Sequence, residues 1–424
     1  MTAGEARAAA EHVARASFGR LVALLAASTG DLALAEDALS AAFEQALITW
    51  PANGVPGNPE AWLLTVARNR QRDTWKSAFH KTSAPLDDAG RNDGAAMTAL
   101  DELDIDAIGD KRLELLFVCA HAAIDPGVRT PLMLQTVLGF DAGRIASAFA
   151  VPATAMAQRL VRAKKRIKEA RIPFTVPGRD AMPGRLPAVL EAIYGCYALD
   201  FRDAADASVQ DAGAEDGEDL AGEAQYLAVS LAGLLRNEPE AWGLAALITL
   251  SQARAASRGG GFVPLEEQDT AAWDVELINE GESYLRQAAA AGAPGRFQLE
   301  AAIQAVHCAR ARTQRTDWPA LRTLYTALVT IAPSLGARVA LAAVIGRTES
   351  PAAGLAALEA IGAGASATVP AAVKHFQPLL ATRAEFLARA GRREEAAAAF
   401  AAAVAVTGQA AIREYLLDRA RHLG

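Results

Sequence analysis

Apolar residues recur every three or four positions along most of the chain, and this spacing predicts an all-α protein. Three helical segments are expected between residues 12 and 81. A Thr-Gly-Asp break at residues 29–31 separates the first from the second, and a loop rich in Pro, Gly and Asn at residues 51–59 precedes the third. The second segment presents one apolar stripe, formed by Ala35, Leu39, Ala42, Phe43, Ala46 and Leu47.

Two shorter helices are predicted nearer the middle of the chain. The first is expected at residues 141–150 and ends where Pro152 disfavours helical geometry in Val151. The second is expected at residues 153–172. Two helices joined by so short a break predict a helix-turn-helix. The second helix keeps one apolar stripe, formed by Met156, Leu160, Ala163 and Ile167.

The second of these helices is strongly cationic. Residues 153–172 contain seven Lys or Arg against one Glu, although the whole chain has a formal net charge of −7. A helix that enters the major groove of DNA needs cations for phosphates and polar side chains for base edges. A solvated cationic helix face has the same pattern, so both interpretations stay open. The side chains largely off the apolar stripe are Gln158, Arg159, Arg162, Lys165 and Arg166.

The third helical segment, residues 59–81, mixes cations with tryptophan. Such a mixture suits opened DNA strands, because the charges follow the phosphates and the aromatic rings stack on unpaired bases. Alternatively both tryptophans are core residues, an interpretation that we favour for Trp62. The residues concerned are Trp62, Arg68, Arg70, Arg72, Trp75 and Lys76.

Several stretches interrupt the helical pattern and predict linkers or loops. Residues 86–106 hold seven Asp or Glu against one Arg, together with glycine, which predicts a flexible acidic linker at 82–108. A second linker is expected at 174–186. An acidic stretch at 200–223 and a glycine run at 258–261 are expected to be exposed loops.

The remaining residues, 187–424, are expected to form helical hairpins with small residues at the helix crossings. The last part fits a tetratricopeptide-like (TPR-like) pattern, in which an aromatic ring fills the space beside the small residues. Such repeats often bind a protein partner, and a scaffold without a ligand is also consistent with the pattern. The matching residues are Ala384, Leu387, Gly391, Glu395, Ala396, Phe400 and Ala403, with partial matches at Trp318, Leu321, Leu324, Tyr325, Leu328 and Pro333 and at Pro351, Gly354, Leu355 and Leu358.

Composition narrows the class of protein. A length of 424 residues predicts two to four domains. The apolar runs are too short to cross a bilayer and the first residues lack the order of a secretory signal, so we expect a cytoplasmic protein that does not contact membranes. Three scattered cysteines, Cys119, Cys196 and Cys308, predict no disulfide framework and no metal site. Nucleotide-binding glycine loops, nucleophile elbows and metalloprotease motifs do not occur in the sequence, so we expect no catalytic residues, no cofactor and no enzymatic activity.

Two motifs in the first helices match a known family. An AED motif precedes Leu39 and Phe43, and a P-x-x-W-L-x-x-x-A-x-N-x-x-x-D pattern follows at residues 59–73. Together they resemble the second conserved region of bacterial RNA polymerase sigma factors of the extracytoplasmic-function (ECF) subgroup. The basic helix-turn-helix is similar to the family's fourth region. The segments GRLPAVL, NEPEAWGL and LEEQDTAAWD, which begin at Gly184, Asn237 and Leu265, resemble the sigma factors that carry a TPR-like extension.

The resemblance implies two small helical domains, region 2 at residues 1–81 and region 4 at 109–173, followed by a TPR-like extension at 187–424. Region 2 would bind core RNA polymerase at the clamp helices of its largest subunit, and region 4 would contact the flap of the second-largest subunit. The implied polymerase-binding residues are Asp37, Phe43, Glu44 and Gln45, with Phe43 favoured as a packing residue.

The resemblance also implies contacts with promoter DNA. Region 2 would hold the melted minus-ten strand through Trp62, Arg68, Asn69, Arg70, Arg72, Trp75 and Lys76, with Asn69 in or near the pocket for a flipped base. Region 4 would read the minus-thirty-five element through Thr154, Gln158, Arg159 and Arg162, with Lys165 and Arg166 on phosphates. Relatives usually have a serine or lysine near the start of this helix, where this chain has Ala155 and Ala157, so their base preference does not transfer.

These features predict a sigma factor that recognises and melts promoter DNA, with an extension that regulates its activity and binds a possible protein partner. The alternative is a helix-turn-helix transcriptional regulator with a TPR-like sensing or protein-interaction domain, which would need neither the AED helix nor the cationic tryptophan-containing helix. A third hypothesis, an enzyme in the C-terminal half, has only the acidic loop at 200–223 in its favour.

Overall fold

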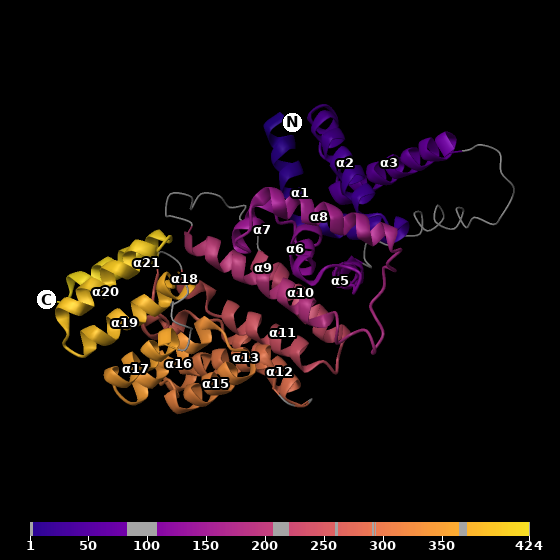
Figure 1. Ribbon diagram of the computed structural model, residues 1–424. Helices are drawn as coiled ribbons and strands as arrows, with labels where there is room; N and C mark the ends of the chain where they lie inside the picture. The colour runs from indigo at the N-terminus through magenta and orange to yellow at the C-terminus, as the bar shows by residue number, and fades with distance from the viewer. Residues whose placement is uncertain are drawn as a thin grey trace. The chain divides into compact units, whose positions relative to one another are not determined.

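The computed structural model describes residues 3–82, 108–206, 220–258, 262–290, 292, 294–363 and 371–423. Every regular element in these segments is a helix, which confirms the predicted all-α fold (Figure 1). In the same segments we find no helix with both the length and the apolarity that a membrane crossing requires. Most of the predicted acidic linker, most of the acidic loop and the glycine run lie outside the described residues.

The chain divides into two compact units. The first comprises Met1–Leu199 and Asp216–Leu220, and the second comprises Asp200–Glu215 and Ala221–Gly424. The division therefore falls inside α9 (Leu186–Asp206), beyond the end of the second predicted linker. The finer domain boundaries expected from the sequence stay a prediction.

The first unit begins with three long helices, α1 (Ala3–Thr29), α2 (Leu32–Asn53) and α3 (Pro59–Thr82). Gly30 adopts a left-handed φ of 67° between α1 and α2, a conformation that glycine takes without steric cost. Asp31 then caps α2 by accepting a hydrogen bond of 3.1 Å from the backbone N–H of Leu34. These two residues explain why the break predicted at 29–31 occurs.

The apolar stripe predicted for α2 is mostly correct. Its buried residues are Leu32, Ala35, Ala38, Leu39, Ala42, Ala46 and Trp50. Phe43 is half-buried and stacks on Phe18 of α1, with 6.4 Å between the ring centroids. Leu47 was expected in the stripe, but its side chain is 47% exposed, because it lies one position past the last buried alanine and turns outward.

Four further helices form the part of this unit that was predicted as region 4: α5 (Ile108–Cys119), α6 (Pro126–Thr136), α7 (Ala142–Ala148) and α8 (Ala153–Glu169). Helices α7 and α8 form the predicted helix-turn-helix and pack on α6. Both are shorter than expected. Asp141 caps α7 instead of joining it, and Arg171 takes a left-handed φ of 47° just after α8 ends.

Helix α1 is shared between the two halves of the first unit. Residues 21–26 of α1 are all fully buried, although an amphipathic surface helix leaves one face in water. The reason is that α1 packs against α2 and α3 on one side and against α5 on another. Gly19 lies directly against the backbone of Val137, where a Cβ atom would overlap the carbonyl oxygen. The two predicted DNA-binding domains are therefore packed on each other in this structure.

In the second unit most helices pack on helices close to them in the sequence, and α11 packs against both α12 and α13. A long connection with three short 3₁₀ turns, η3 (Ala255–Arg258), η4 (Leu265–Glu267) and η5 (Thr270–Ala272), joins α11 to α12. The helices are α10 (Leu220–Leu234), α11 (Pro239–Gln252), α12 (Val275–Ala289), α13 (Arg296–Cys308), α14 (Arg310–Thr313), α15 (Trp318–Ile331), α16 (Leu335–Thr348), α17 (Pro351–Ala363), α18 (Ala371–Lys374), α19 (Gln377–Arg389), α20 (Arg393–Val406) and α21 (Ala410–Arg421).

The predicted repeat pattern near the C-terminus coincides with the hairpin of α19 and α20. Gly391 turns the chain between them with a φ of 73°. Ala384, Ala396 and Ala403 are fully buried at the helix crossing, and the ring of Phe400 is 1% exposed beside them. Small residues thus bring the helices close and the aromatic ring fills the space, as the pattern predicts.

Candidate nucleic-acid interface

Helix α8 presents one cationic face to solvent and one apolar face to the protein. Met156, Leu160, Ala163 and Ile167 are buried, which is the stripe predicted from the sequence. The predicted minus-thirty-five residues all lie on the exposed side or its flanks: Thr154, Gln158, Arg159, Arg162, Lys165 and Arg166. Val161 shares the exposed face and is 66% exposed, a position that sequence reasoning missed. The face therefore offers cations, a polar amide and one apolar side chain at helical spacing.

The turn before α8 fixes the angle at which this face is held. Ala150 adopts a left-handed φ of 51°, which costs an alanine about 1 kcal/mol relative to helical geometry. Asp141 accepts hydrogen bonds from the backbone N–H groups of Gly143 and Arg144, at 2.8 and 2.9 Å. The guanidinium of Arg144 lies 4.5 Å from the centroid of the Phe140 ring. These contacts hold α7 in place, so that α8 projects its cationic face outward.

Helix α3 exposes only some of the residues predicted for the minus-ten strand. Asn69 and Arg70 are exposed, whereas Leu64 and Ala67 just before them are buried. Arg68 and Arg72 are half-buried and interact with other residues of the chain. The side chains of Trp75 and Lys76 lie outside the described residues.

Trp62 packs against α2, and its predicted contact with DNA stays a prediction. Its ring meets the buried Trp50 of α2 edge to face, with 5.6 Å between the ring centroids, and its side chain is half-buried. Asn58 starts the helix by accepting a hydrogen bond of 3.0 Å from the N–H of Ala61. The first turn of α3 is thus fixed against α2, and its exposed polar face begins at Thr65.

Helix α2 carries the predicted polymerase-binding residues. Asp37, Glu44 and Gln45 are exposed, and the amide of Gln45 donates a hydrogen bond of 2.8 Å to Thr49. Beside them Leu47 and Ile48 are 47% and 72% exposed. The sequence did not predict this exposed pair, because the helical period places Leu47 near the buried face. Leu47 and Ile48 add a small apolar area beside these polar side chains.

Two ion pairs join α8 to α2. The Nζ of Lys164 lies 2.7 Å from the Oε2 of Glu36, and the Nζ of Lys168 lies 2.7 Å from the Oδ2 of Asp31. The lysines are one helical turn apart, so both reach the same end of α2. Burial raises the pKa of Glu36 above its usual value, and the opposing effect of Lys164 is smaller. The pair is therefore partly desolvated, and its contribution to stability is modest.

Other reactive groups of the first unit lie inside the core. The Cys119 thiol is fully buried, with its Sγ 3.6 Å from the hydroxyl of Thr136, and burial raises its pKa to about 12. Among the described residues we find no cluster of three or more His, Cys, Asp or Glu side chains that could hold a metal ion. What the exposed faces of α2, α3 and α8 offer is binding chemistry.

Known proteins resemble the chain in two ways. An uncharacterized protein of Rhizobium meliloti (strain 1021) is 36% identical over 336 residues, which cover 78% of each chain. The probable ECF RNA polymerase sigma factor SigI of Mycobacterium tuberculosis is 30% identical over 164 residues, in both strain CDC 1551 / Oshkosh and strain ATCC 25618 / H37Rv. That similarity spans 38% of this chain and 55% of the sigma factor.

A family model described as a family of unknown function, DUF6596, matches residues 185–289. No solved structure is significantly similar to the chain. The chain belongs to the same family as the Rhizobium meliloti protein, and part of it is homologous to an ECF RNA polymerase sigma factor.

Proposed function

We propose that this protein is a sigma factor, which binds core RNA polymerase and directs promoter-specific initiation by recognising and melting promoter DNA. The observation that carries the proposal is the outward cationic face of α8 on a complete helix-turn-helix. The partial homology to a probable ECF sigma factor supports the same function. The protein would act in the cytoplasm, without a cofactor and without catalysis of its own.

Each exposed face receives one partner in this proposal. Asp37, Glu44 and Gln45, with Leu47 and Ile48, would bind the clamp helices of the largest polymerase subunit. Asn69 and Arg70 would hold the melted minus-ten strand. Helix α8 would read the minus-thirty-five element, with Gln158 and Arg162 on base edges and Lys165 on phosphates. The helix-turn-helix domain would also contact the flap of the second-largest subunit.

Promoter binding requires the first unit to open. The two promoter elements are about 25 base pairs apart, or about 85 Å at 3.4 Å per base pair. Helix α8 has 17 residues and is about 26 Å long, and it is joined directly to α2 by Lys164 and Lys168. Because α8 contacts α2 and α2 contacts α3, the packed unit holds the two proposed DNA-binding faces much closer together than the two elements are. We propose that polymerase binding separates α8 from α2 and α5 from α1, and that the closed unit is the form without polymerase.

The proposal is tested by mixing the purified full chain with core polymerase and a cognate promoter. A stable complex and permanganate-reactive thymines at the minus-ten element are expected. Arg162→Gln serves as the matched variant, because it removes one charge from α8 and leaves α2 and α3 intact. Failure to bind core polymerase at micromolar concentrations would contradict the proposed function.

The second unit is proposed to regulate this activity and to bind a protein partner through its TPR-like helices. Size and helical-hairpin architecture support this part of the proposal. A chain that ends at Leu220 keeps the whole first unit and removes residues 221–424. We expect its promoter activity or polymerase affinity to differ severalfold from the full chain. Unchanged values for both would remove the regulatory role.

The alternative is a transcriptional regulator that binds duplex DNA and does not melt it. The half-burial of Arg68 and Arg72 favours this alternative, because it narrows the cationic face that a single strand would follow. The two functions differ in one readout. A regulator protects duplex DNA without core polymerase and produces no permanganate-reactive bases, whereas the sigma factor produces them only with polymerase.

A further inference from the structure

The connection between α11 and α12 is unusually long for two helices of an antiparallel hairpin. Helix α11 ends at Gln252 and α12 begins at Val275. Connections longer than about 12 to 15 residues without secondary structure are uncommon in compact domains and are usually either functional or linkers; this one contains three short 3₁₀ turns. We call residues 262–274 of this connection the strap, because they run from α12 to residues of α14, α16 and α21 that are far away in the sequence.

One end of the strap is fixed in the core. The Trp273 side chain is 3% exposed, and its indole N–H donates a hydrogen bond of 3.2 Å to Ser257. The guanidinium groups of Arg254 and Arg310 lie 6.0 and 5.4 Å from the centroid of its ring. Trp273 packs with Leu250, Ile278 and Cys308, so this end belongs to the hydrophobic core.

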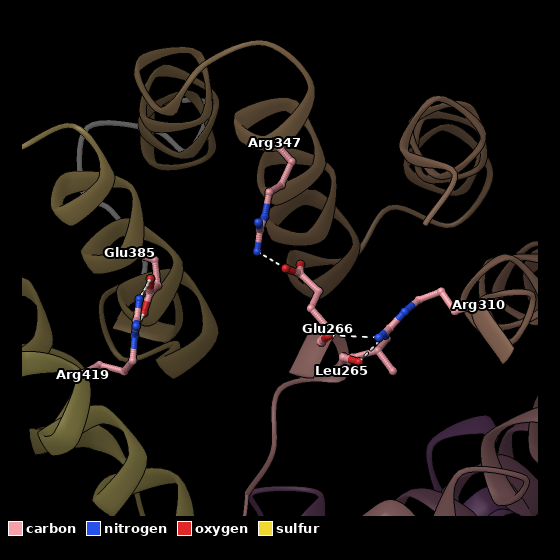
Figure 2. A network of polar contacts seen from close by, with 6 residues as sticks. All are labelled: Leu265, Glu266, Arg310, Arg347, Glu385 and Arg419. Atoms are coloured by element: carbon pink, nitrogen blue, oxygen red, sulfur yellow. Dashed lines mark hydrogen bonds and ion pairs between the residues drawn. The ribbon is translucent and has the colours of Figure 1, made fainter. Parts of the chain in front are cut away.

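The other end of the strap lies on an arginine-rich face, as a bound peptide would. Arg310 donates hydrogen bonds to the carbonyl oxygens of Leu265 and Glu266, at 2.5 and 3.0 Å, and Arg347 of α16 pairs with the Glu266 carboxylate (Figure 2). Phe262 meets the ring of Tyr415 in α21 edge to face, with 5.2 Å between the centroids. Main-chain carbonyls, a carboxylate and an aromatic ring are thus each recognised by a residue far along the chain.

Charge complementarity defines what this face accepts. The strap carries Glu266, Glu267 and Asp269, and the residues that contact it are Arg310, Arg347 and Tyr415, a set that we call the arginine face. Arg419 of α21 is paired instead with Glu385 of α19, at 2.8 and 2.7 Å (Figure 2). An extended segment with an aromatic residue followed by carboxylates fits the arginine face.

The contacts at this end are weak enough to exchange. The side chains of Arg347 and Glu266 are 42% and 39% exposed, and exposed ion pairs contribute at most about 1 kcal/mol. The ring of Phe262 is 41% exposed. The Trp273 end, by contrast, is buried. Leu265 is half-buried and packs against the same cluster as Trp273. An incoming segment must therefore displace it together with the exposed Phe262 and Glu266, while the strap stays attached at Trp273.

We propose that the arginine face is a docking site for an acidic, extended protein segment, and that the strap occupies it as an internal competitor until such a segment binds. The inference concerns the second unit alone and holds whether or not the protein is a sigma factor. A strap tethered at Trp273 has an effective concentration in the millimolar range, so a partner must bind tightly or present several contacts to replace it.

The test uses the full-length protein and a labelled peptide with the sequence of residues 262–269, FVPLEEQD. In the Phe262→Ala/Glu266→Gln variant the strap releases the face, and we expect the peptide to bind about tenfold more tightly than to the unaltered chain. Adding Arg347→Gln should abolish this gain. Glu276→Gln, on the exposed start of α12, is the control for a charge change outside the strap.

A second measurement does not depend on any variant. Saturating peptide should raise amide hydrogen exchange within residues 262–267, where the Glu267 N–H donates to the Pro264 carbonyl, while residues 271–274 keep their protection. A neutral peptide, FVPLQQQN, should do neither. The proposal would be overturned if the peptide bound the unaltered chain and the Phe262→Ala/Glu266→Gln variant equally tightly, or if adding Arg347→Gln did not weaken binding. Unchanged exchange in residues 262–267 would also overturn it.

Discussion

Lys164 of α8 lies 2.7 Å from Glu36 of α2, although 128 positions separate them in the sequence. The lysine belongs to the helix proposed to read promoter DNA, and the glutamate belongs to the helix proposed to bind polymerase. The contact therefore joins two helices that, in the proposed function, separate when the protein binds both promoter elements. Substitutions at this contact therefore test the closed form of the first unit most directly.

Reversing one charge of this pair should open the first unit. Glu36→Lys places two cations together, and we expect the closed form to lose about 1 kcal/mol, or about fivefold in its opening equilibrium. Amide exchange of residues 21–26 of α1, which are fully buried when the unit is closed, measures that opening. The double variant Glu36→Lys/Lys164→Glu restores an attractive pair and should restore protection.

Lys165→Glu is the matched control for that experiment. Lys165 neighbours Lys164 on α8 but is 73% exposed on the outward side. Its reversal should leave the exchange of residues 21–26 unchanged and should weaken DNA binding. If residues 21–26 of α1 exchange their amide hydrogens as slowly in the Glu36→Lys variant as in the unaltered chain, the ion pair does not hold the unit closed.

Val161 should contribute sequence preference where the neighbouring cations contribute salt dependence. An apolar side chain in the major groove contacts the thymine methyl group. Replacing single thymines of the minus-thirty-five element by deoxyuridine should therefore cost about fivefold in affinity at one position, and Val161→Ala should remove that cost. Lys165→Gln should instead lower the slope of log affinity against log salt by about 1. Additive effects of deoxyuridine and Val161→Ala at every position would refute the contact.

Asn69 should matter more for melting than for duplex binding. Its side chain is exposed on α3, next to Arg70 in the sequence. Asn69→Ala should reduce permanganate reactivity of the minus-ten thymines at least tenfold, while the affinity for a fully paired promoter changes less than twofold. Thr65→Ala, one turn earlier on the same exposed face, is the control. An equal loss of melting and duplex binding would contradict the role given to Asn69.

The sequence predicted the elements of the first unit well because those elements rest on local patterns. The four buried residues of α8 were all identified, because the period of 3.6 residues and the preceding proline are both local features of the sequence. The caps at Asp31 and Asp141 explain where the helix boundaries fall. Leu47 was misplaced because a period alone does not say where a partner helix ends.

Contacts between distant segments were not predictable from one sequence. The pairing of Lys164 with Glu36 depends on how two helical domains pack, and the charge pattern of either helix alone only indicates a solvated face. The same holds for the strap. LEEQDTAAWD was identified as a sequence feature, but its attachment to Arg310 and Arg347 follows from the path of the chain.

His307 should make the second unit sensitive to acid. Burial, with smaller effects of Arg254 and Arg310, lowers its pKa from 6.5 to about 4. The unfolded chain therefore takes up the proton first as the pH falls, so stability is full above about pH 6.5 and is lost progressively toward pH 4. At pH 5 the loss is about 2 kcal/mol at most.

The urea midpoints at pH 7 and pH 5 measure this loss. His307→Gln should reduce the difference between the two midpoints, and His375→Gln, at an exposed position, should not. The same pH dependence in the His307→Gln variant would assign the acid sensitivity to other groups.

Gly354 should be required for the packing of α17 on α16 and α19. A Cβ atom at this position would overlap the ring of Phe386 and the backbone of Gly346, and Phe386 is 3% exposed in the core of that region. Gly354→Ala should therefore destabilise the second unit by about 2 kcal/mol, because the ring must leave its rotamer or the helices must separate. Gly362, also in α17, has nothing within 4 Å of a Cβ atom, so Gly362→Ala should be neutral or stabilising by up to about 1 kcal/mol.

Urea unfolding of the two variants measures the difference. Phe386→Leu combined with Gly354→Ala should recover part of the loss if the ring is the obstacle. Equal stability of the two alanine variants would show that α17 does not depend on close contact at Gly354.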